Sequence, residues 1–504
     1  MSSRGAAVTA DTAADGTSVC SKAAAAAHDL EVQTRPVPTI EYSVFSPTKR
    51  RLVLIMCAAA GFFSPFSAFT YFPAIEYIAK DLGVSLQLIN LTITLFLVVQ
   101  GIAPAVIGDL AHQIGRRPVY ILVLILYFAA CVGLAVQRSY PALLILRMIQ
   151  SAGSSGTIAL GIMVVSDLVP PHARGRYVGA LLSGPNCGPS IGPVIGGVLT
   201  EFASWPWIFW LLSILGGICL VPFAILFPET CRGVVGNGAY KGGKWNEPVL
   251  RVLCPRNRCA PPENAKLGHK LKTFPNPFTC LRIIGRRHDA LLLSSNAAFY
   301  IAYSCLQASL APLLMQYYHL NPLQAGLSYL SYGIATISSS YIIGKVLDLD
   351  YRISARQAGI TINKVEGDDV ATFPIERARI RSLIGFVVAG IAATVGFGWS
   401  IETRLSLAAT LVVTFIAGIA YTGVFNSCLT LNVDLHPDET GLASVAASVT
   451  RCLSAAVGVA ILQPLLNSIG PGWTFTVYGF ICVLALPMLL VLRIWGPSWR
   501  GCSF

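Results

Sequence analysis

The stretch Gly108–Tyr120, GDLAHQIGRRPVY, lies between two long apolar runs, at residues 88–107 and 119–136. Each run is close to the ~20 residues that cross ~30 Å of hydrocarbon at ~1.5 Å per residue. The stretch itself combines glycines with a Gly-Arg-Arg-Pro cluster, which is typical of a tight charged turn. It therefore predicts two membrane helices joined by a short turn, within a polytopic membrane protein.

The composition agrees with a lipid-embedded chain. Across 504 residues, 54% are hydrophobic and only 12% are charged, and the mean hydropathy is +0.64. A soluble domain carries more charge than this, so the lipid bilayer is the expected surrounding. The net charge of +12 does not predict nucleic-acid binding, because the basic residues follow a topological distribution instead.

Twelve apolar segments predict an all-α membrane protein. They lie at residues 51–73, 88–108, 118–137, 141–166, 175–200, 205–227, 289–313, 324–347, 382–400, 405–431, 441–467 and 473–495. With an even number of spans both termini share a side. Placing them inside leaves only Lys80, Arg138 and Arg404 in outside segments, so the positive-inside rule predicts cytoplasmic termini.

These segments predict the domain organisation. We expect a disordered cytoplasmic tail at 1–50, a six-helix bundle at 51–228, a cytoplasmic central loop at 229–288, a second bundle at 289–495 and a cytoplasmic tail at 496–504. An enlarged cytoplasmic loop is expected at 349–380. The first 45 residues are rich in Ala, Ser and Thr and lack the apolar core of a cleaved signal peptide.

Two short patterns recur six spans later. One is a Gly followed by residues four and eight positions on, at Gly108, His112 and Arg116 and again at Gly344, Asp348 and Arg352. The other is Asp-Leu-x-Pro at the ends of spans four and ten, at Asp167–Pro170 and Asp434–Pro437. Such parallel repeats indicate a transporter whose substrate site lies between the halves. Chance recurrence is the alternative, because Gly, Asp and Pro are common at helix ends.

No cofactor or metal site is expected from the sequence. The 14 Cys are scattered, and Cys254 and Cys259 have no His or Cys partner at zinc spacing. The seven His are dispersed, and no Gly-rich loop followed by Lys-Ser or Lys-Thr is present. An enzyme and an ATP-driven pump are therefore both disfavoured.

Several ordered motifs carry a family resemblance. They are the turn Gly108–Arg117, an RxxQxxG pattern at Arg147, Gln150 and Gly153, GPSIGPVIGG at Gly188–Gly197, TYFPAI at Thr70–Ile75, PPHARGR at Pro170–Arg176, PETCR at Pro228–Arg232 and RCLSAAVGVA at Arg451–Ala460. With them, roughly residues 50–500 resemble the major facilitator superfamily, in particular its fungal twelve-span drug:proton antiporter branch, which includes organic-acid exporters. One departure is His112, which stands where the family has an acid.

The resemblance implies two pseudo-symmetric six-helix bundles and two sets of working residues. The antiporter motif would be Gly188, Pro189, Gly192, Pro193, Gly196 and Gly197. The gating residues would be Gly108, Asp109, His112, Gly115, Arg116, Arg117, Asp167, Gly344, Asp348, Arg352 and Asp434. We expect Asp167 to pair with Arg116 or Arg117 and Asp434 to pair with Arg352; helix-end charges without specific partners are the alternative.

The spans also predict a positively charged cavity. Arg147 and Arg451 lie well inside spans four and eleven, whereas no Asp or Glu occupies the middle of a span. Candidate cavity residues are Arg147, Gln150, Asn186, Asn296, Tyr300, Tyr303, Gln307, Asn426 and Arg451, with Gln100 and Tyr332 as further polar candidates. An Arg that only braces neighbouring helices, or a polar stripe that only joins them, is the alternative.

These features predict an alternating-access exporter of small organic molecules, such as xenobiotics or a secondary metabolite, expected to be proton-coupled. An exporter of small carboxylates such as citrate-like acids is the second hypothesis, and a non-transporting membrane sensor is a third of another class. The expected partners are the small-molecule substrate, protons and lipid, for a monomer in the plasma membrane. The carrier of the proton is not identified by the sequence.

Overall fold

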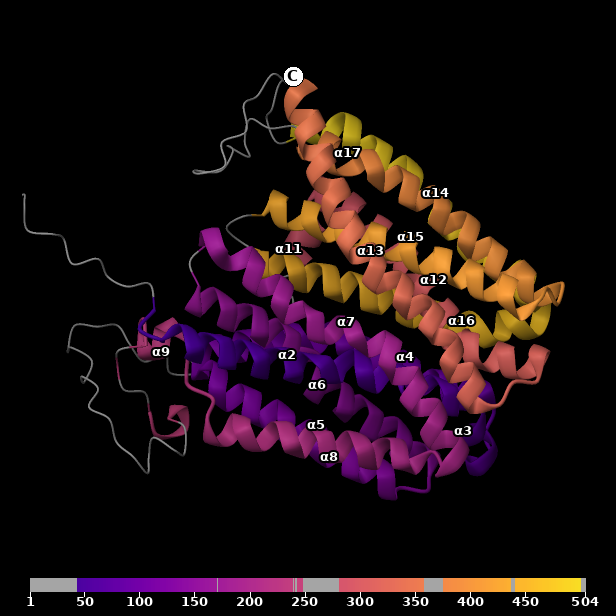
Figure 1. The fold of residues 1–504 in the computed structure, drawn as a ribbon, viewed down its shortest axis with the longest axis horizontal. Helices are drawn as coiled ribbons and strands as arrows, with labels where there is room; N and C mark the ends of the chain where they lie inside the picture. The colour runs from indigo at the N-terminus through magenta and orange to yellow at the C-terminus, as the bar shows by residue number, and fades with distance from the viewer. Residues whose placement is uncertain are drawn as a thin grey trace, which may run out of the picture. The chain divides into compact units, whose positions relative to one another are not determined.

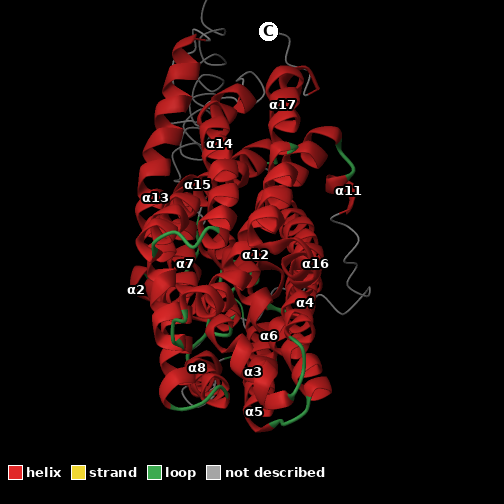
Figure 2. Cartoon of the chain, turned by 90° about the vertical axis from the view of Figure 1, so that its right-hand side faces the viewer, coloured by secondary structure: helices red, strands yellow, loops and turns green. Residues whose placement is uncertain are grey.

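The computed structural model describes residues 43–169, 171–238, 240, 243–247, 281–357, 375–436 and 440–499. The predicted tail at 1–42, most of the central loop with Cys254 and Cys259, residues 358–374 of the enlarged loop and the tail at 500–504 lie outside the described residues. The chain divides into two units, Met1–Val44 and Phe45–Phe504. All elements below belong to the second, in which helices are joined by loops (Figure 2).

The first half contains six long helical stretches. They are α2 (Pro47–Phe69) continued by η1 (Phe72–Ala74) and α3 (Ile75–Leu82), then α4 (Leu86–Ile114), α5 (Arg116–Val136), α6 (Tyr140–Leu168), α7 (Pro171–Phe202) and α8 (Pro206–Ile225). Two short elements follow, α9 (Arg232–Val235) and η2 (Lys244–Asn246). The predicted turn between these two helices is present but shorter than residues 108–120: α4 ends at Ile114, Gly115 has a φ of 110° that suits glycine, and α5 starts at Arg116.

The second half repeats this arrangement. It contains α11 (Leu281–Ile284), α12 (Arg287–Tyr318), α13 (Pro322–Gln357), α14 (Ile375–Glu402), α15 (Leu407–Leu435), α16 (Thr440–Val483) and α17 (Ala485–Trp499). Within α16, Gly470 has a non-helical φ of 75° and breaks the helix. Predicted span eleven lies before Gly470, and predicted span twelve consists of the segment after it together with α17.

The described helices match the twelve predicted spans. Nine stretches of the described residues are long and apolar enough to cross a membrane. One of them, Leu442–Trp499, is 58 residues long and contains spans eleven and twelve on either side of Gly470. Spans five and eight correspond to α7 and α13, which are not among the nine and are rich in Gly, Pro, Ser or Tyr. The predicted all-α membrane fold is confirmed.

Helix packing within and between the halves is pseudo-symmetric. In the first half α2 packs on α7, α6 on α4 and α5, and α5 on α8; in the second α12 packs on α16, and α15 on α13 and α14. The halves meet through α4 with α16 and α7 with α13 (Figure 1). In span numbers these are the pairs two–eleven and five–eight. In a duplicated six-span unit, span two corresponds to span eight and span five corresponds to span eleven. The two contacts between the halves are therefore equivalent to each other.

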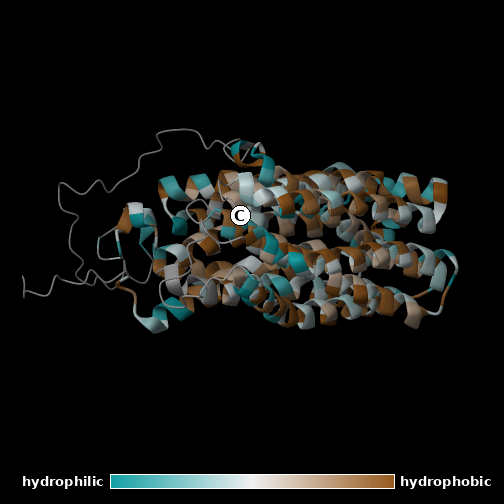
Figure 3. Ribbon diagram, turned by 90° about the horizontal axis from the view of Figure 1, so that it is seen from above, coloured by the Kyte–Doolittle hydropathy of each residue, from teal (hydrophilic) through white to brown (hydrophobic). Residues whose placement is uncertain are grey.

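Large apolar side chains on the outside of these helices face outward. Ile55 is 65% exposed, Ile218 63% and Phe480 68%, and hydrophobic residues continue along the helices of both halves (Figure 3). Such continuous exposure is unfavourable in water but fits the hydrocarbon of a bilayer. The core between the helices is also mainly hydrophobic and contains large aromatic side chains such as Phe66 and Tyr421.

Candidate functional site

A cavity of about 370 Å³ lies between the two halves. Its wall is mostly aromatic and apolar, with Phe69 and Phe96 from the first half and Phe425 from the second. The predicted cavity residues on this wall are Arg147, Asn186, Asn296, Tyr300, Tyr303, Gln307, Asn426 and Arg451, together with Gln100 and Tyr332. Gln150 is not part of the wall and lies buried behind it.

Arg147 is held in place by the first half. Its side chain is 1% exposed, and Nη1 donates to Gln150 Oε1 at 2.8 Å and to the Ser67 carbonyl at 3.4 Å. The guanidinium lies 3.9 Å from the centroid of the Tyr71 ring, a cation–π contact. Both the bracing and the cavity interpretation of Arg147 thus have a structural basis, and Gln150 is the residue that positions it.

Arg451 faces the cavity with fewer partners. It is half-buried, and its guanidinium lies 4.6 Å from the centroid of the Tyr300 ring. Within the described part of the chain its buried Nε has no hydrogen-bond partner, and neither does Oδ1 of Asn296. Unpaired buried polar atoms on a cavity wall are available to a ligand, because leaving them unpaired costs roughly 1–3 kcal/mol each.

The charge on the described cavity wall is positive. Arg147 and Arg451 are its charged residues, and no Asp or Glu is among the described residues that line it. A guanidinium in a low-dielectric wall is costly unless it meets an acceptor. The wall therefore offers two cationic groups beside a large aromatic surface.

The predicted polar stripe of α12 also points into this cavity. Asn296, Tyr300, Tyr303 and Gln307 recur at helical spacing and all line the wall. The rings of Tyr300 and Tyr303 lie 5.3 Å apart, and both contact Phe425 of α15 at 5.5 Å. The stripe thus supplies cavity surface and also packs against a neighbouring helix.

The two halves contact each other at one end of the helices, and the cavity wall extends toward the other end. The end of the helices that holds Arg116, Asp167 and Asp434 is called the loop end below, and the opposite end is called the far end. At the far end Asn90 donates to Gln463 across the halves at 3.4 Å. The cavity wall instead continues toward the loop end, to Ile162 on α6 and Asn432 on α15.

The Gly-Pro motif of α7 packs against two different helices. A Cβ on Gly188 would lie 2.8 Å from Phe66 N, and one on Gly192 would lie 3.0 Å from Phe69 Cβ, both on α2; Gly196 meets Thr70 just beyond it. Gly197 instead meets Pro322 and Leu323 of α13 in the other half. Within the motif, Gly192 therefore packs inside the first half, and Gly197 contacts the second half.

The two prolines of the motif have different surroundings. Pro189 lines the cavity. The carbonyl of Pro193 lies against Gly326 on α13. The motif thus places the backbone of α7 close to both halves at once.

The first-half turn forms the predicted ion pair. Arg116 Nε lies 3.1 Å from Asp167 Oδ2, and Arg116 Nη2 lies 3.2 Å from His112 Nδ1. Arginine only donates, so His112 accepts this bond with a ring lone pair. His112 therefore takes a hydrogen-bonding place in the turn without the charge of an acid. Gly108 is buried in α4, and Asp109 beside it is half-buried.

Arg117 does not pair with Asp167. Its guanidinium donates to the carbonyls of Phe227, Trp245 and Ala224 at 3.0, 2.8 and 2.6 Å. The prediction left Asp167 to either arginine, and the structure selects Arg116. Arg117 instead ties the start of α5 to the end of the first half.

Glu229 is a buried carboxylate whose partners sequence reasoning missed. Its carboxylate is 3% exposed and accepts bonds from the backbone N–H groups of Arg116, Arg117, Thr230 and Cys231 at 2.8, 3.2, 3.0 and 2.9 Å. It therefore caps the positive N-terminus of α5. Burial raises the pKa of this carboxyl above its ordinary value, and the four N–H bonds oppose the rise. The PETCR motif was visible, but the distance of more than one hundred residues hid its partner.

Asp434 pairs with a residue other than the predicted one. Its Oδ2 lies 3.0 Å from Nε of Arg379 on α14, whereas Arg352 is exposed on α13, so the predicted Arg352–Asp434 pair is wrong. The offset that maps Gly108 onto Gly344 maps Gly115 onto Tyr351. Because the second half has no glycine at this position, α13 stays helical to Gln357. Arg352 therefore lies within α13 and not at the start of the next helix, where Arg116 lies in the first half.

The other second-half gating positions are only partly defined. Gly344 is exposed with open space around its Cα, and the side chain of Asp348 lies outside the described residues. A nearby acid, Asp350, is buried and accepts from the backbone N–H of Ser382 at 3.2 Å. It also accepts from the Ser382 hydroxyl.

The structure also brings two histidines together. His288 and His436 both lie against Asp289 at the loop end, so the expectation that the histidines are dispersed is wrong for this pair. They are 148 residues apart in the chain, but the start of span seven and the end of span ten share a membrane side, which could have suggested the meeting.

Comparison with known proteins agrees with this geometry. The family described as Major Facilitator Superfamily matches residues 57–363. The MFS-type transporter phiD of a fungal species is 36% identical over 472 residues, covering 93% of this chain and 71% of that protein. Citrate exporter 1 of Aspergillus niger is 31% identical over 479 residues, covering 94% of this chain and 90% of that protein.

A solved structure is similar in fold. The crystal structure of a D-xylose–proton symporter superposes with a TM-score of 0.63 at 15% sequence identity, covering 86% of this chain and 96% of that chain. At this identity the likeness concerns the fold alone. Taken with the family match and the fungal relatives, it means that this chain belongs to the major facilitator superfamily, a family of multi-pass membrane transporters rather than enzymes.

Proposed function

We propose that this transporter is a proton-coupled, alternating-access exporter of small organic molecules that carry an anionic or electron-rich group on an apolar or aromatic body. The observation that carries the proposal is the cavity wall, where Arg147 and Arg451 are the charged residues amid aromatic side chains. Cationic groups favour anions, and an aromatic wall favours an apolar body. Xenobiotics and fungal secondary metabolites with an acidic or phenolic group fit this description.

An exporter of citrate-like carboxylates is the second candidate. Two guanidinium groups support it, and one relative is named as a citrate exporter. Against it, most of the cavity wall is apolar, which leaves a small polycarboxylate with few hydrogen-bonding partners. The third candidate is a membrane sensor without transport activity. Such a protein would need no cavity that extends toward the loop end, so the cavity argues against it.

Transport in vesicles tests the proposal. Protein reconstituted in liposomes with an imposed pH gradient should move an aromatic carboxylate faster than its neutral amide analogue, and faster than citrate. Arg451→Gln should weaken the apparent affinity for the carboxylate more than for the amide. Equal transport of both analogues, by wild type and variant alike, would contradict the anionic preference, and movement independent of the pH gradient would contradict proton coupling.

We further propose that the transporter is a plasma-membrane monomer with both termini and residues 229–288 in the cytoplasm. The distribution of Lys and Arg supports this orientation. A single Cys introduced at Ser204, in a background without native Cys, should react with an impermeant reagent added to intact cells. A single Cys at Ala260 should react only after permeabilisation, and its labelling in intact cells would overturn the orientation.

A further inference from the structure

We propose that His288, Asp289 and His436 form a binding site for a divalent transition metal ion of the Zn²⁺ type at the loop end of the second half. Asp289 and His288 begin α12, and His436 follows the end of α15. His436 Nε2 lies 3.1 Å from Asp289 Oδ2, and His288 Nε2 lies 3.3 Å from the same oxygen. One ligand atom from each residue lies within 4.8 Å of the others.

The geometry of His436 argues for a cation in this cluster. Its Nδ1 lies 3.3 Å from the backbone carbonyl oxygen of Asn432. A carbonyl oxygen can only accept, so Nδ1 carries the proton of the neutral ring and Nε2 presents a lone pair. That lone pair faces a carboxylate that is 0% exposed. Two electron-rich atoms 3.1 Å apart repel each other unless a cation lies beside them.

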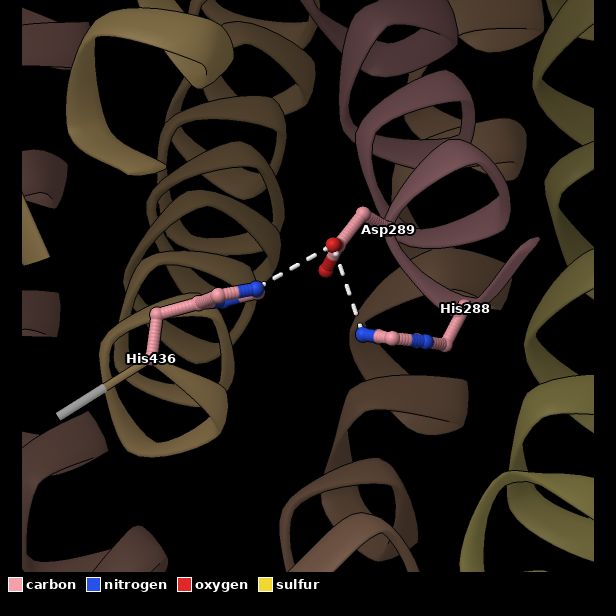
Figure 4. A group of neighbouring side chains, drawn as sticks. All are labelled: His288, Asp289 and His436. Atoms are coloured by element: carbon pink, nitrogen blue, oxygen red, sulfur yellow. Dashed lines mark ion pairs between the residues drawn. The ribbon is translucent and has the colours of Figure 1, made fainter. Parts of the chain in front are cut away.

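A metal ion suits the directions of these groups better than a proton does. His436 Nε2 and both carboxylate oxygens of Asp289 are buried without a hydrogen bond in the described part of the chain. Although Nε2 is close to the oxygen, an N–H on it would not be aligned with that oxygen. Figure 4 shows the two imidazoles entering from opposite sides with their Nε2 atoms leading, beside the carboxylate. The lone pairs thus converge on a common space.

The donor set defines the class of metal. Two imidazoles and one carboxylate are ligands for zinc and other first-row transition metals, whereas Mg²⁺ and Ca²⁺ prefer oxygen alone. The bond from His436 Nδ1 to a carbonyl is the outer contact that orients metal-binding histidines. His288 is 23% exposed, so an ion can reach the cluster from solution, and solvent can fill the remaining coordination position.

The position of the cluster links it to the cavity. Leu292 and Leu293 lie one helical turn from Asp289, Asn432 lies one turn from His436, and all three line the cavity. A metal ion here would fasten the start of α12 to the end of α15 beside the loop end of the cavity. This role does not depend on the identity of the transported molecule.

Cobalt binding tests the proposal. The full-length protein, purified in detergent with a tag free of histidine, should bind one equivalent of Co²⁺ with a visible d–d spectrum, and Zn²⁺ should displace it. His288→Gln and His436→Gln should each weaken binding at least about tenfold. His319→Asn is the matched control, because it removes a histidine at the other end of α12 and should leave binding unchanged.

Two further readouts keep the result independent of folding defects. Zn²⁺ should raise the thermal midpoint of wild type and of His319→Asn but not of His288→Gln, whose partly exposed side chain makes a folding defect a poor explanation. Absence of saturable binding by wild type, an affinity of His288→Gln equal to that of wild type, or an intense thiolate-to-cobalt band from cysteine ligation would each overturn the site. The cluster would then be an imidazolium–carboxylate contact.

Discussion

Arg379 and Asp434, 3.0 Å apart between Nε and Oδ2, form in the second half the ion pair that Arg116 and Asp167 form at 3.1 Å in the first. Each pair joins two consecutive helices within one half, α14 to α15 and α5 to α6. Neither pair crosses between the halves. Each pair therefore ties two neighbouring helices of its own bundle together and forms no ionic link between the halves.

The first prediction concerns these pairs. The first-half side chains are 3% and 11% exposed, whereas those of the second half are 14% and 24% exposed. Asp167→Asn should therefore cost more stability, about 2–3 kcal/mol, than Asp434→Asn, about 1 kcal/mol, because solvent screens the second pair more. Thermal unfolding in detergent measures both. An equal loss would mean that burial does not set the strength of these pairs.

A charge exchange provides the control for this prediction. The double variant Arg379→Asp with Asp434→Arg keeps the pair with its polarity reversed, whereas each single change leaves two like charges together. The double variant should recover most of the midpoint that either single variant loses. No recovery would show that neighbouring groups, such as the Tyr351 ring 5.5 Å from the Arg379 guanidinium, matter more than the pair.

The identity of Asp434's partner shows where sequence reasoning stops. Span positions, orientation signals and the repeat depend on local hydropathy and spacing, so they could be predicted. The pairing with Arg379 depends on whether one backbone position permits a left-handed turn. Gly115 permits it and Tyr351 does not, and an offset counted along the sequence ignores this difference.

The sequence also allowed some residues of the candidate site to be predicted and not others. Arg147, Arg451 and the α12 stripe could be selected because a polar residue inside a span is conspicuous. Glu229 and the His288–Asp289–His436 cluster could not, because they lie at span ends, where polar residues are ordinary. Only three-dimensional packing distinguishes a buried cap or cluster from a solvated helix end.

The second prediction concerns Glu229. Glu229→Ala removes the acceptor of four buried N–H groups and should lower the free energy of unfolding by about 2–3 kcal/mol. Glu229→Gln keeps one oxygen acceptor and should cost less. Glu201→Gln, at an exposed position, is the control and should be neutral. If Glu229→Ala were as stable as that control, the cap would have no structural role.

The same residue predicts a dependence on pH. Because the Glu229 pKa is raised in the folded protein, the folded state binds this proton more tightly than the unfolded chain does. Its contribution is thus most favourable at low pH and declines as pH rises from the unfolded value through the raised folded value. Because other carboxyl groups titrate in both proteins, the difference in slope isolates Glu229: wild type should lose stability with rising pH more steeply than Glu229→Gln across that window. Identical slopes would contradict the raised pKa.

The third prediction concerns the α7 motif. Gly197→Leu places a side chain against Pro322 of the other half, and Gly192→Leu places one against Phe69 of the same half. Both should abolish export with protein retained in the membrane, but only Gly197→Leu should leave the first bundle's stability near that of wild type. Gly179→Leu, with open space on the same helix, is the control. Normal export by Gly197→Leu would contradict close packing between α7 and α13 as a requirement for transport.

The last prediction separates the two arginines. Arg147 is bonded to Gln150 and to the Ser67 carbonyl and stacks on Tyr71, so Arg147→Gln should weaken export of all substrates and lower stability. Arg451 has one aromatic contact and an unpaired Nε. Arg451→Gln should therefore raise the apparent affinity constant for an anionic substrate about tenfold or more, with little change for its neutral analogue.

Efflux assays in vesicles with a matched pair of substrates, one anionic and one neutral, distinguish these outcomes. The control variant is Arg138→Gln, at an exposed position, which removes a positive charge far from the cavity. Gln150→Leu adds a second test, because it removes the anchor of Arg147 but no charge. It should reproduce part of the Arg147→Gln defect without any preference between the two substrates. Full anion export by both arginine variants would refute a cationic cavity, and an equal loss for both substrates in Arg451→Gln would reduce that residue to a structural role.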